Sequence, residues 1–250
     1  MKLYGLIGYP LGHSFSKKYF TEKFQQEGII DCSYELFPIS SITDLPSLLI
    51  SNPNLKGLNV TIPYKEQVLQ FINETTDAVK NIGAANTVKI HRDKLIAHNT
   101  DVIGFEISLL KKLKPPTSYR DKKALILGTG GSSKAVQYVF KKLGIDFLLV
   151  TRNYNSSPGT IHYSMIDEVI MNQYHLIINC TPVGMFPNED KCPDLPYEYL
   201  TKHHYLFDLI YKPEKTLFLK KGEDKGAMIQ NGYEMLIIQA EESWKIWNTD

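Results

Sequence analysis

The sequence predicts an α/β protein with two domains, and three observations carry that prediction. At 250 residues, the chain is long enough for two modest domains, each with its own core. Short apolar runs alternate with helical periodicity along most of the sequence, which is typical of sheets with helices between their strands. From about Lys122 the apolar runs become continuous, as expected for a parallel sheet covered on both faces.

The first half is expected to form one domain. Phe20 and Phe24, four residues apart, indicate a helix over residues 14–27. Arg92 and Asp93 separate two apolar runs, which predicts a β-hairpin. The other expected elements are strands over 2–8, 32–37 and 58–62, a short helix over 45–50, and a helix from Pro63, since proline suits a helix's first turn.

The second half is expected to start between residues 101 and 122. There a helix over 102–113 leads into the Pro115-Pro116 pair, which breaks it. The later expected elements are strands over 122–128, 146–151, 175–179 and 204–211, with helical stretches between them, and a last amphipathic helix over 233–247.

Composition and charge exclude several classes of function. The net charge is +1 without a basic run or acidic tail, so neither nucleic acid nor a membrane is an expected partner. The N-terminal apolar run is broken too early, by a glycine and a proline, for a signal or spanning segment. Cys32, Cys180 and Cys192 form no CxxC pair, which favours reduced thiols in a cytoplasmic protein over disulfides or a zinc site. We expect no bound metal and no glycan at the Asn59 sequon.

A glycine-rich turn marks the candidate nucleotide site. The strand ending at Leu127 runs into residues 128–135, GTGGSSKA, and a helix is expected to follow. Glycines at such a turn let the backbone approach a pyrophosphate, whose charge the helix N-terminus favours. Ser133 takes the third glycine position of GxGxxG, and a plain tight turn is the alternative; strand, turn and helix in register favour a dinucleotide site. The expected contacts are Gly128, Thr129, Gly130, Gly131 and Ser132.

The end of the next strand bears on the choice of nucleotide. Thr151-Arg152-Asn153 stands where an NAD site usually has an acidic residue for the ribose hydroxyls. A guanidinium instead pairs well with a 2′-phosphate. A solvated surface arginine is the alternative, and NADP(H) is the predicted cofactor.

Two charged side chains at strand ends are candidates for proton transfer. An enzyme that reduces a carbonyl with a nicotinamide needs a proton donor at the developing alkoxide and a group that holds it. Lys65 follows a predicted strand, and a cation at the start of the next helix opposes the macrodipole, which argues for a purpose other than helix stability. Asp101 begins another helix, where it is either an N-cap or a carboxylate paired with Lys65.

Short motifs follow one another in a fixed order along the chain. They are Ser14-Phe15-Ser16, residues 59–65 (NVTIPYK), 83–88 (GAANTV), Asn99-Thr100-Asp101 with Gly104-Phe105, the glycine turn, 179–185 (NCTPVGM), 208–211 (DLIY), and Gly232 with Met235 and Gln239. In this order the chain resembles the shikimate dehydrogenase family nearly from end to end. The resemblance implies reversible, NADPH-dependent reduction of 3-dehydroshikimate to shikimate in aromatic amino-acid biosynthesis.

The resemblance also implies a role for each matching residue. Lys65 is the acid/base, and Asp101 orients it and the substrate. A polyhydroxylated ring acid needs many short donors and acceptors. Ser14 and Ser16 bind its carboxylate, while Thr61, Asn86, Asp101, Tyr211 and Gln239 contact its hydroxyls or carboxylate. Asp77 lies near the nicotinamide, and Thr151, Arg152, Asn153, Ile210 and Gly232 are further cofactor contacts.

Departures from the family pattern leave two alternatives. Lys17 stands where the family commonly has proline, close to the predicted carboxylate site, and Ser132, Thr151 and Asn153 differ from the usual residues around the cofactor. One alternative is therefore a quinate/shikimate dehydrogenase of broader specificity, with NAD as the alternative cofactor. The other is a non-catalytic relative that binds the same ligands, against which the intact Lys65 and Asp101 argue.

The resemblance predicts how the domains are arranged. Residues 1–100 would bind substrate, 101–231 would form a Rossmann-like NADP domain, and 232–250 would form a helix that packs back on the first domain. The active site would lie in the cleft between the domains, with a small-molecule substrate as the partner. The protein is expected to be a monomer or a homodimer in the cytoplasm.

Overall fold

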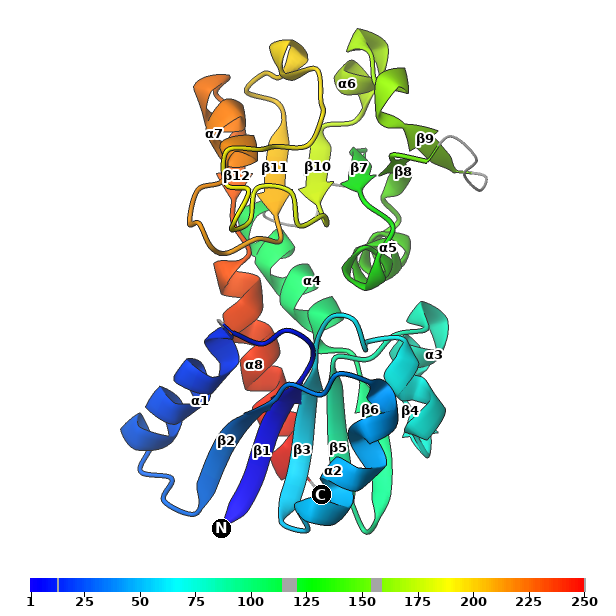
Figure 1. The fold of residues 1–250 in the computed structure, drawn as a ribbon. Helices are drawn as coiled ribbons and strands as arrows, with labels where there is room; N and C mark the ends of the chain where they lie inside the picture. Colours follow the sequence, from blue (N-terminus) through cyan, green and yellow to red (C-terminus); the bar gives the residue numbers. More distant parts are fainter. Residues whose placement is uncertain (13, 114–120, 154–158, 250) are drawn as a thin grey trace. The chain divides into compact units, whose positions relative to one another are not determined.

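The structure is a computed structural model and describes residues 1–12, 14–113, 121–153 and 159–249 (Figure 1). Its contacts divide the chain into two compact units. Unit 1 comprises Met1–Thr100 with Gln239–Asp250, and unit 2 comprises Asp101–Ile238. Each unit holds one six-stranded sheet with helices, so the predicted α/β class is confirmed.

Unit 1 is built on a mixed sheet with the strand order β2-β1-β3-β5-β6-β4. β1 pairs in parallel with β2 and β3, whereas β3, β5 and β6 are antiparallel neighbours. The strands are β1 (Lys2–Ile7), β2 (Cys32–Phe37), β3 (Leu55–Val60), β4 (Glu74–Thr75), β5 (Thr87–His91) and β6 (Lys94–His98). The helices are α1 (Phe15–Gln26), α2 (Leu45–Ser51), α3 (Asp77–Ile82) and the 3₁₀ turns η1 (Ile42–Asp44) and η2 (Gln67–Phe71).

The side chains of β1 alternate between two cores, one on each face of this sheet. Leu3 and Ile7 belong to the core under α2, η2 and α3. Tyr4 and Leu6 belong to the core formed with α1 and the end of α8 (Tyr233–Asn248). This alternation follows from the two-residue period of a strand.

Trp247 fastens the end of α8 to unit 1. Its ring stacks on Tyr4 with 4.9 Å between the centroids, and its Nε1 donates to the Val88 carbonyl at 3.0 Å. A Cβ atom at Gly57 would lie 2.3 Å from the indole, so only glycine lets the helix come this close to β3.

Two predictions for unit 1 have different outcomes. The hairpin is confirmed: Arg92 and Asp93, at φ 47° and 62°, join β5 to β6 in the left-handed conformation that tight hairpin turns require. The helix expected from Pro63 is wrong. Residues 61–64 form a turn, closed by the Tyr64 amide donating to the Thr61 carbonyl at 2.9 Å, and only the short η2 follows.

Unit 2 is built on a fully parallel sheet with the order β12-β11-β10-β7-β8-β9. The chain starts at the centre with β7, adds β8 and β9 on one side, and then returns to add β10, β11 and β12 on the other. This is the doubly wound order of dinucleotide-binding folds. The strands are β7 (Lys123–Leu127), β8 (Asp146–Thr151), β9 (Thr160–His162), β10 (Leu176–Asn179), β11 (Tyr205–Asp208) and β12 (Met228–Gln230).

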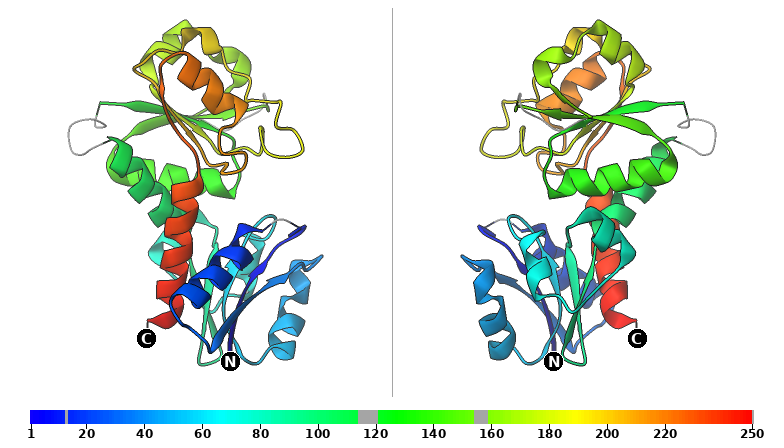
Figure 2. Two further views of the ribbon diagram at one scale, coloured as in Figure 1. Left: turned by 90° about the vertical axis from the view of Figure 1, so that its left-hand side faces the viewer. Right: turned by 90° about the vertical axis from the view of Figure 1, so that its right-hand side faces the viewer.

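Helices cover both faces of the parallel sheet, as both views of Figure 2 show. On one face, Phe105 of α4 packs its ring 5.6 Å from Phe140 of α5 and 5.3 Å from Phe207 of β11. On the other, Met171 of α6 and Phe218 of α7 share a core with the sheet. The helices are α4 (Thr100–Leu113), α5 (Gly131–Leu143), α6 (Glu168–Gln173), α7 (Leu217–Asp224) and the 3₁₀ turns η3 (Tyr163–Met165) and η4 (Tyr197–Tyr199).

Most strand predictions for unit 2 are confirmed, with one correction. The strand expected over 204–211 ends at Asp208, whose carboxylate turns back to accept the Ile210 amide. The Pro115-Pro116 pair lies outside the described residues. Within the described part of the chain, no helix is both long enough and apolar enough to span a membrane.

Candidate active site

The two serines that are predicted to bind the substrate carboxylate lie at the start of α1. Ser14 is the N-cap, and its Oγ accepts the Ser16 amide at 3.2 Å. Both serines are half-buried. Ser14 therefore does cap the helix, and this role leaves its hydroxyl hydrogen for an anion.

Thr61 and Lys65 stand on the turn after β3. The Thr61 amide donates to the Ile7 carbonyl at 3.0 Å, which ties the turn to β1. The Lys65 carbonyl accepts the Ala85 amide at 2.8 Å, so its backbone is fixed by a neighbouring segment. Lys65 is half-buried and does not begin an α-helix. The expectation that Lys65 stands at a helix N-terminus, against the macrodipole, is therefore wrong. Its position on the turn after β3 is the remaining reason to consider it a site residue.

Asn86 and Gln239 form a direct pair. Asn86 is buried, and its Oδ1 accepts the Thr100 amide at 2.7 Å. Its Nδ2 donates to Thr100 Oγ1 at 3.0 Å and to Gln239 Oε1 at 3.2 Å. Because Gln239 accepts here through its oxygen, its Nε2 group is the end that it can offer to a ligand as a donor.

A second set of neutral side chains in unit 1 connects these residues. Tyr34 donates to Asn59 Oδ1 at 2.8 Å, and Asn59 Nδ2 donates to Ser243 Oγ at 2.9 Å and Thr87 Oγ1 at 3.2 Å. Ser243 in turn donates to the Gln239 carbonyl at 2.8 Å. A directed series of hydrogen bonds thus runs from Tyr34 to the backbone carbonyl of Gln239.

Sequence reasoning missed four members of this series, Tyr34, Asn59, Thr87 and Ser243. Ser243 carried a usable signal, since it follows Gln239 by four residues and so lies on the same side of α8. Burial raises the pKa of the Tyr34 phenol far above its usual range, while the hydrogen bond from Ser16 opposes that shift. Tyr34 therefore stays neutral and keeps its donor.

Asp77 and Asp101 occupy first turns of helices, in contrasting surroundings. Asp77, in α3, is exposed, and its carboxylate lies 3.5 Å from Lys80 Nζ. Asp101, in α4, is buried. Lys65 belongs to unit 1 and Asp101 to unit 2, and their pairing stays a prediction.

The glycine turn of unit 2 has the features that a pyrophosphate needs. Gly130 is the N-cap of α5, and no side chain caps the first turn of that helix. Space is open around the position of a Cβ at Gly130, and Thr129 and Gly130 are exposed. Gly128 has φ +101°, a conformation that only glycine adopts readily. An N-cap without a side chain, open space and a helix N-terminus fit a bound dinucleotide.

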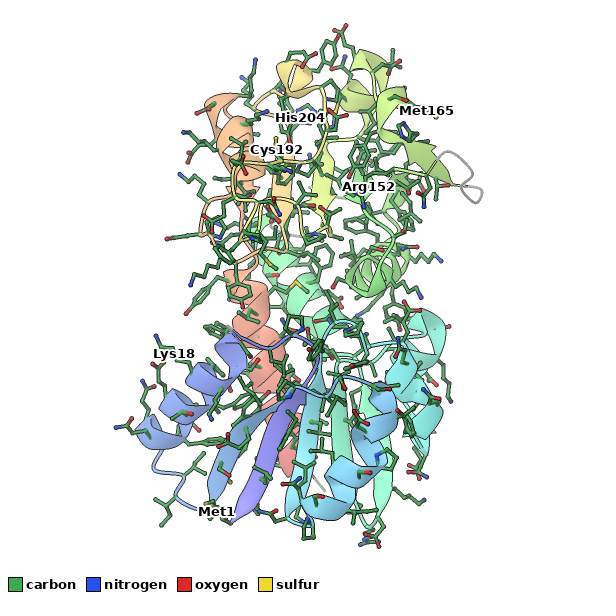
Figure 3. All side chains as sticks on the ribbon, in the orientation of Figure 1. Met1, Lys18, Arg152, Met165, Cys192 and His204 are labelled. Carbon is green, nitrogen blue, oxygen red and sulfur yellow. The ribbon has the colours of Figure 1, made fainter. Side chains whose placement is uncertain are left out.

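The other predicted cofactor residues lie at the same edge of the parallel sheet. Arg152 follows β8 directly and is exposed (Figure 3), while Thr151 Oγ1 accepts the Asn153 amide at 3.2 Å. Gly232 donates its amide to the Ile210 carbonyl at 3.0 Å, and a Cβ there would lie 2.1 Å from the Leu209 carbonyl oxygen. Tyr211 is half-buried beside Ile210.

Each unit thus brings part of the predicted site together. Unit 1 connects Asn86 and Gln239 through a hydrogen bond, and the predicted cofactor residues of unit 2 gather where its strands end. Asp77 belongs to neither group: in the described part of the chain, the side chains that hydrogen-bond to it are Lys80 and Asn81 of its own helix. Among the described residues, no group of three or more His, Cys, Asp or Glu side chains gathers as metal ligands would.

Comparisons with known proteins show which proteins this chain is similar to. Residues 6–88 match the model of the shikimate dehydrogenase substrate binding domain. The shikimate dehydrogenase (NADP(+)) of Carboxydothermus hydrogenoformans is 34% identical, over 98% of this chain and 91% of that protein. A chorismate mutase/shikimate 5-dehydrogenase fusion protein from Clostridium acetobutylicum is 36% identical, with a TM-score of 0.87 over 99% of this chain and 91% of that chain. The shikimate 5-dehydrogenase of Thermus thermophilus, solved with NADP(H) and shikimate, is 27% identical, with a TM-score of 0.85 over 99% and 94%.

Proposed function

Because this chain belongs to the shikimate dehydrogenase family, we propose that it catalyses the reversible, NADPH-dependent reduction of 3-dehydroshikimate to shikimate. The observation that carries this proposal is the series of neutral hydrogen-bonding side chains in unit 1. Asn86 and Gln239 present short donors and acceptors whose positions are fixed by buried partners. Such a set suits a small ring acid with several hydroxyls.

The proposed roles of the residues follow from their chemistry. Ser14 and Ser16 donate to the substrate carboxylate, and Thr61, Asn86, Tyr211 and Gln239 bind the hydroxyls or the carboxylate. Lys65 gives a proton to the oxygen of the reacting carbonyl during reduction and takes it back during oxidation. Asp101 orients that lysine and the ring. Fixed partners reduce the entropy that must be lost on the way to the transition state.

The proposed cofactor site is the glycine turn together with the end of β8. NADPH, when bound, supplies the hydride. The amides of residues 129–132 would hold the pyrophosphate at the start of α5. Arg152 would pair with the 2′-phosphate, flanked by Thr151 and Asn153. Ile210, Gly232 and Asp77 are the proposed contacts near the nicotinamide. The protein would work in the cytoplasm as a monomer or a homodimer.

A direct assay tests the proposed reaction. Purified protein is mixed with 3-dehydroshikimate and NADPH while the nicotinamide absorbance is followed, with NADH and 3-dehydroquinate as parallel controls. We expect oxidation of NADPH with 3-dehydroshikimate to be much faster than with any other pair. Comparable rates with 3-dehydroquinate would instead support a dehydrogenase of broader specificity. No turnover in folded protein that still binds shikimate would support a ligand-binding relative without activity.

A further inference from the structure

Asp208 is a buried carboxyl group that the proposed chemistry does not use. It ends β11 and is 0% exposed. Its Oδ1 accepts the Asn179 side-chain amide at 3.0 Å and the Ile210 backbone amide at 3.0 Å. Its Oδ2 accepts the Thr216 hydroxyl at 2.6 Å. All three partners are neutral donors, so a carboxylate satisfies them together.

Asn179 carries this set of hydrogen bonds to a second loop. Its Oδ1 accepts both the amide of Thr181, at 3.0 Å, and the hydroxyl of Thr181, at 2.7 Å. Thr181 Cγ2 lies 3.0 Å from the position that a Cβ on Gly128 would take, so this loop also borders the glycine turn. One buried carboxyl group therefore links the segments that follow β10 and β11, beside the segment that follows β7.

These three segments lie where the parallel strands end, beside the point at which the strand order reverses. In doubly wound sheets, this is the crevice that receives the nucleotide. Asp208 and Asn179 are both fully buried, so neither side chain is available to contact a ligand there. What they set is the position of Ile210 and of the Thr181 loop.

We propose that Asp208 is a positioning residue that holds the Ile210 backbone and, through Asn179, the Thr181 loop in the arrangement that binds NADP(H). This inference rests on the proposed function, because Ile210 is assigned to the cofactor there. It adds a residue that acts through its hydrogen-bonded neighbours and not through contact with the nucleotide.

The ionisation of Asp208 makes this inference testable. Burial raises the pKa of this carboxyl to about 7, while the hydrogen bonds from Thr216, Ile210 and Asn179 pull it down. Cys180 and Tyr197 interact with its charge, but burial raises the pKa of each far above neutral. Of these three groups, only Asp208 changes charge near pH 7. Protonation places a hydrogen among three donors, so one of the hydrogen bonds must be lost or reversed.

The experiment measures the Kd of NADP⁺ from pH 6 to pH 8 by titration calorimetry, in wild type and in three variants. Asp208→Asn places an amide among the same donors and imitates the protonated state. Thr216→Val removes the strongest hydrogen bond to the carboxylate and moves the pKa up. Leu206→Val, a buried change on the same strand, is the control for lost stability alone. The 2′-phosphate titrates near pH 6 in every sample, so only differences between samples are compared.

We expect the wild-type Kd to rise about three- to tenfold more than that of Asp208→Asn as the pH falls through 7. Asp208→Asn should bind weakly at both ends of the range, and Thr216→Val should move the midpoint upward. A parallel pH profile in wild type and Asp208→Asn would overturn the proposal and leave Asp208 a purely structural group. If Asp208→Asn does not fold, the midpoint in Thr216→Val decides. Because binding is measured without turnover, failure of the dehydrogenase assay would not affect this test.

Discussion

Lys65 is the residue on which the proposed proton transfer depends. Lys65→Ala is expected to lower kcat by about 10²-fold or more, because no group replaces the proton donor, while substrate affinity changes less. Steady-state kinetics in both directions provide the measurement, with the exposed Lys56→Ala on β3 as the matched control. Near-normal kcat in Lys65→Ala would remove this lysine from the mechanism.

Arg152 is the residue on which the choice of nucleotide depends. Removing a charge-assisted hydrogen bond to a phosphate costs about 1.5–3 kcal/mol, which corresponds to roughly 10- to 100-fold in binding. Arg152→Ala should therefore raise the KM for NADPH by such a factor and leave the KM for NADH nearly unchanged. Parallel assays with both nucleotides test this, and an unchanged KM for NADPH would show that the arginine has another role.

Helix α8 is the element that carries both a predicted ligand residue and an anchor of unit 1. Trp247 is 6% exposed and packs on Tyr4, while Gln239 lies on the same helix. Trp247→Ala should cost about 3–5 kcal/mol of unfolding free energy and also raise the KM for the substrate. Urea denaturation and kinetics measure the two effects. Trp244→Ala, which removes a ring that is only partly buried, should cost less.

The elements also show what the sequence could predict. Strands such as β2 and β8 were bounded correctly because β2 lies between Asp31 and Pro38, and the apolar run of β8 is followed by the polar pair Arg152-Asn153. The helix from Pro63 was wrong because local preference competed with a tertiary hydrogen bond, between the Lys65 carbonyl and the Ala85 amide. The short edge strands β9 and β12 carry no apolar run that a pattern could detect.

The candidate site was predicted only in part, because some of its hydrogen bonds join residues that are far apart in the sequence. Asn86 and Gln239 stand in recognisable motifs, and the structure joins them directly. Tyr34 and Ser243 became visible only through the fold, because partners that lie 25 and 184 residues away in sequence meet at Asn59. No local pattern encodes such distant pairs.

At the scale of the whole molecule, Asp208 makes stability depend on pH. Its pKa is about 7 in the folded state, above the ordinary 3.8, so the folded protein binds the proton more tightly than the unfolded chain. Its contribution to the free energy of unfolding is fully present below about pH 4. That contribution, at most about 4 kcal/mol, is lost as the pH rises to about 7. Urea denaturation from pH 5 to pH 8 should show a steeper decline in wild type than in Asp208→Asn. Equal slopes in the two proteins would contradict this.

The division of α8 between the units has a consequence for how the protein is made. The core that covers one face of the first sheet includes Ala240 and Trp247, which are translated long after Tyr4, Phe20 and Tyr34. While the chain is still being synthesised, those aromatic rings lack their partners, whereas unit 2 has all its residues once Ile238 has been added. We therefore expect unit 1, although it comes first in the sequence, to complete this core only after the last residues of unit 2 have been added.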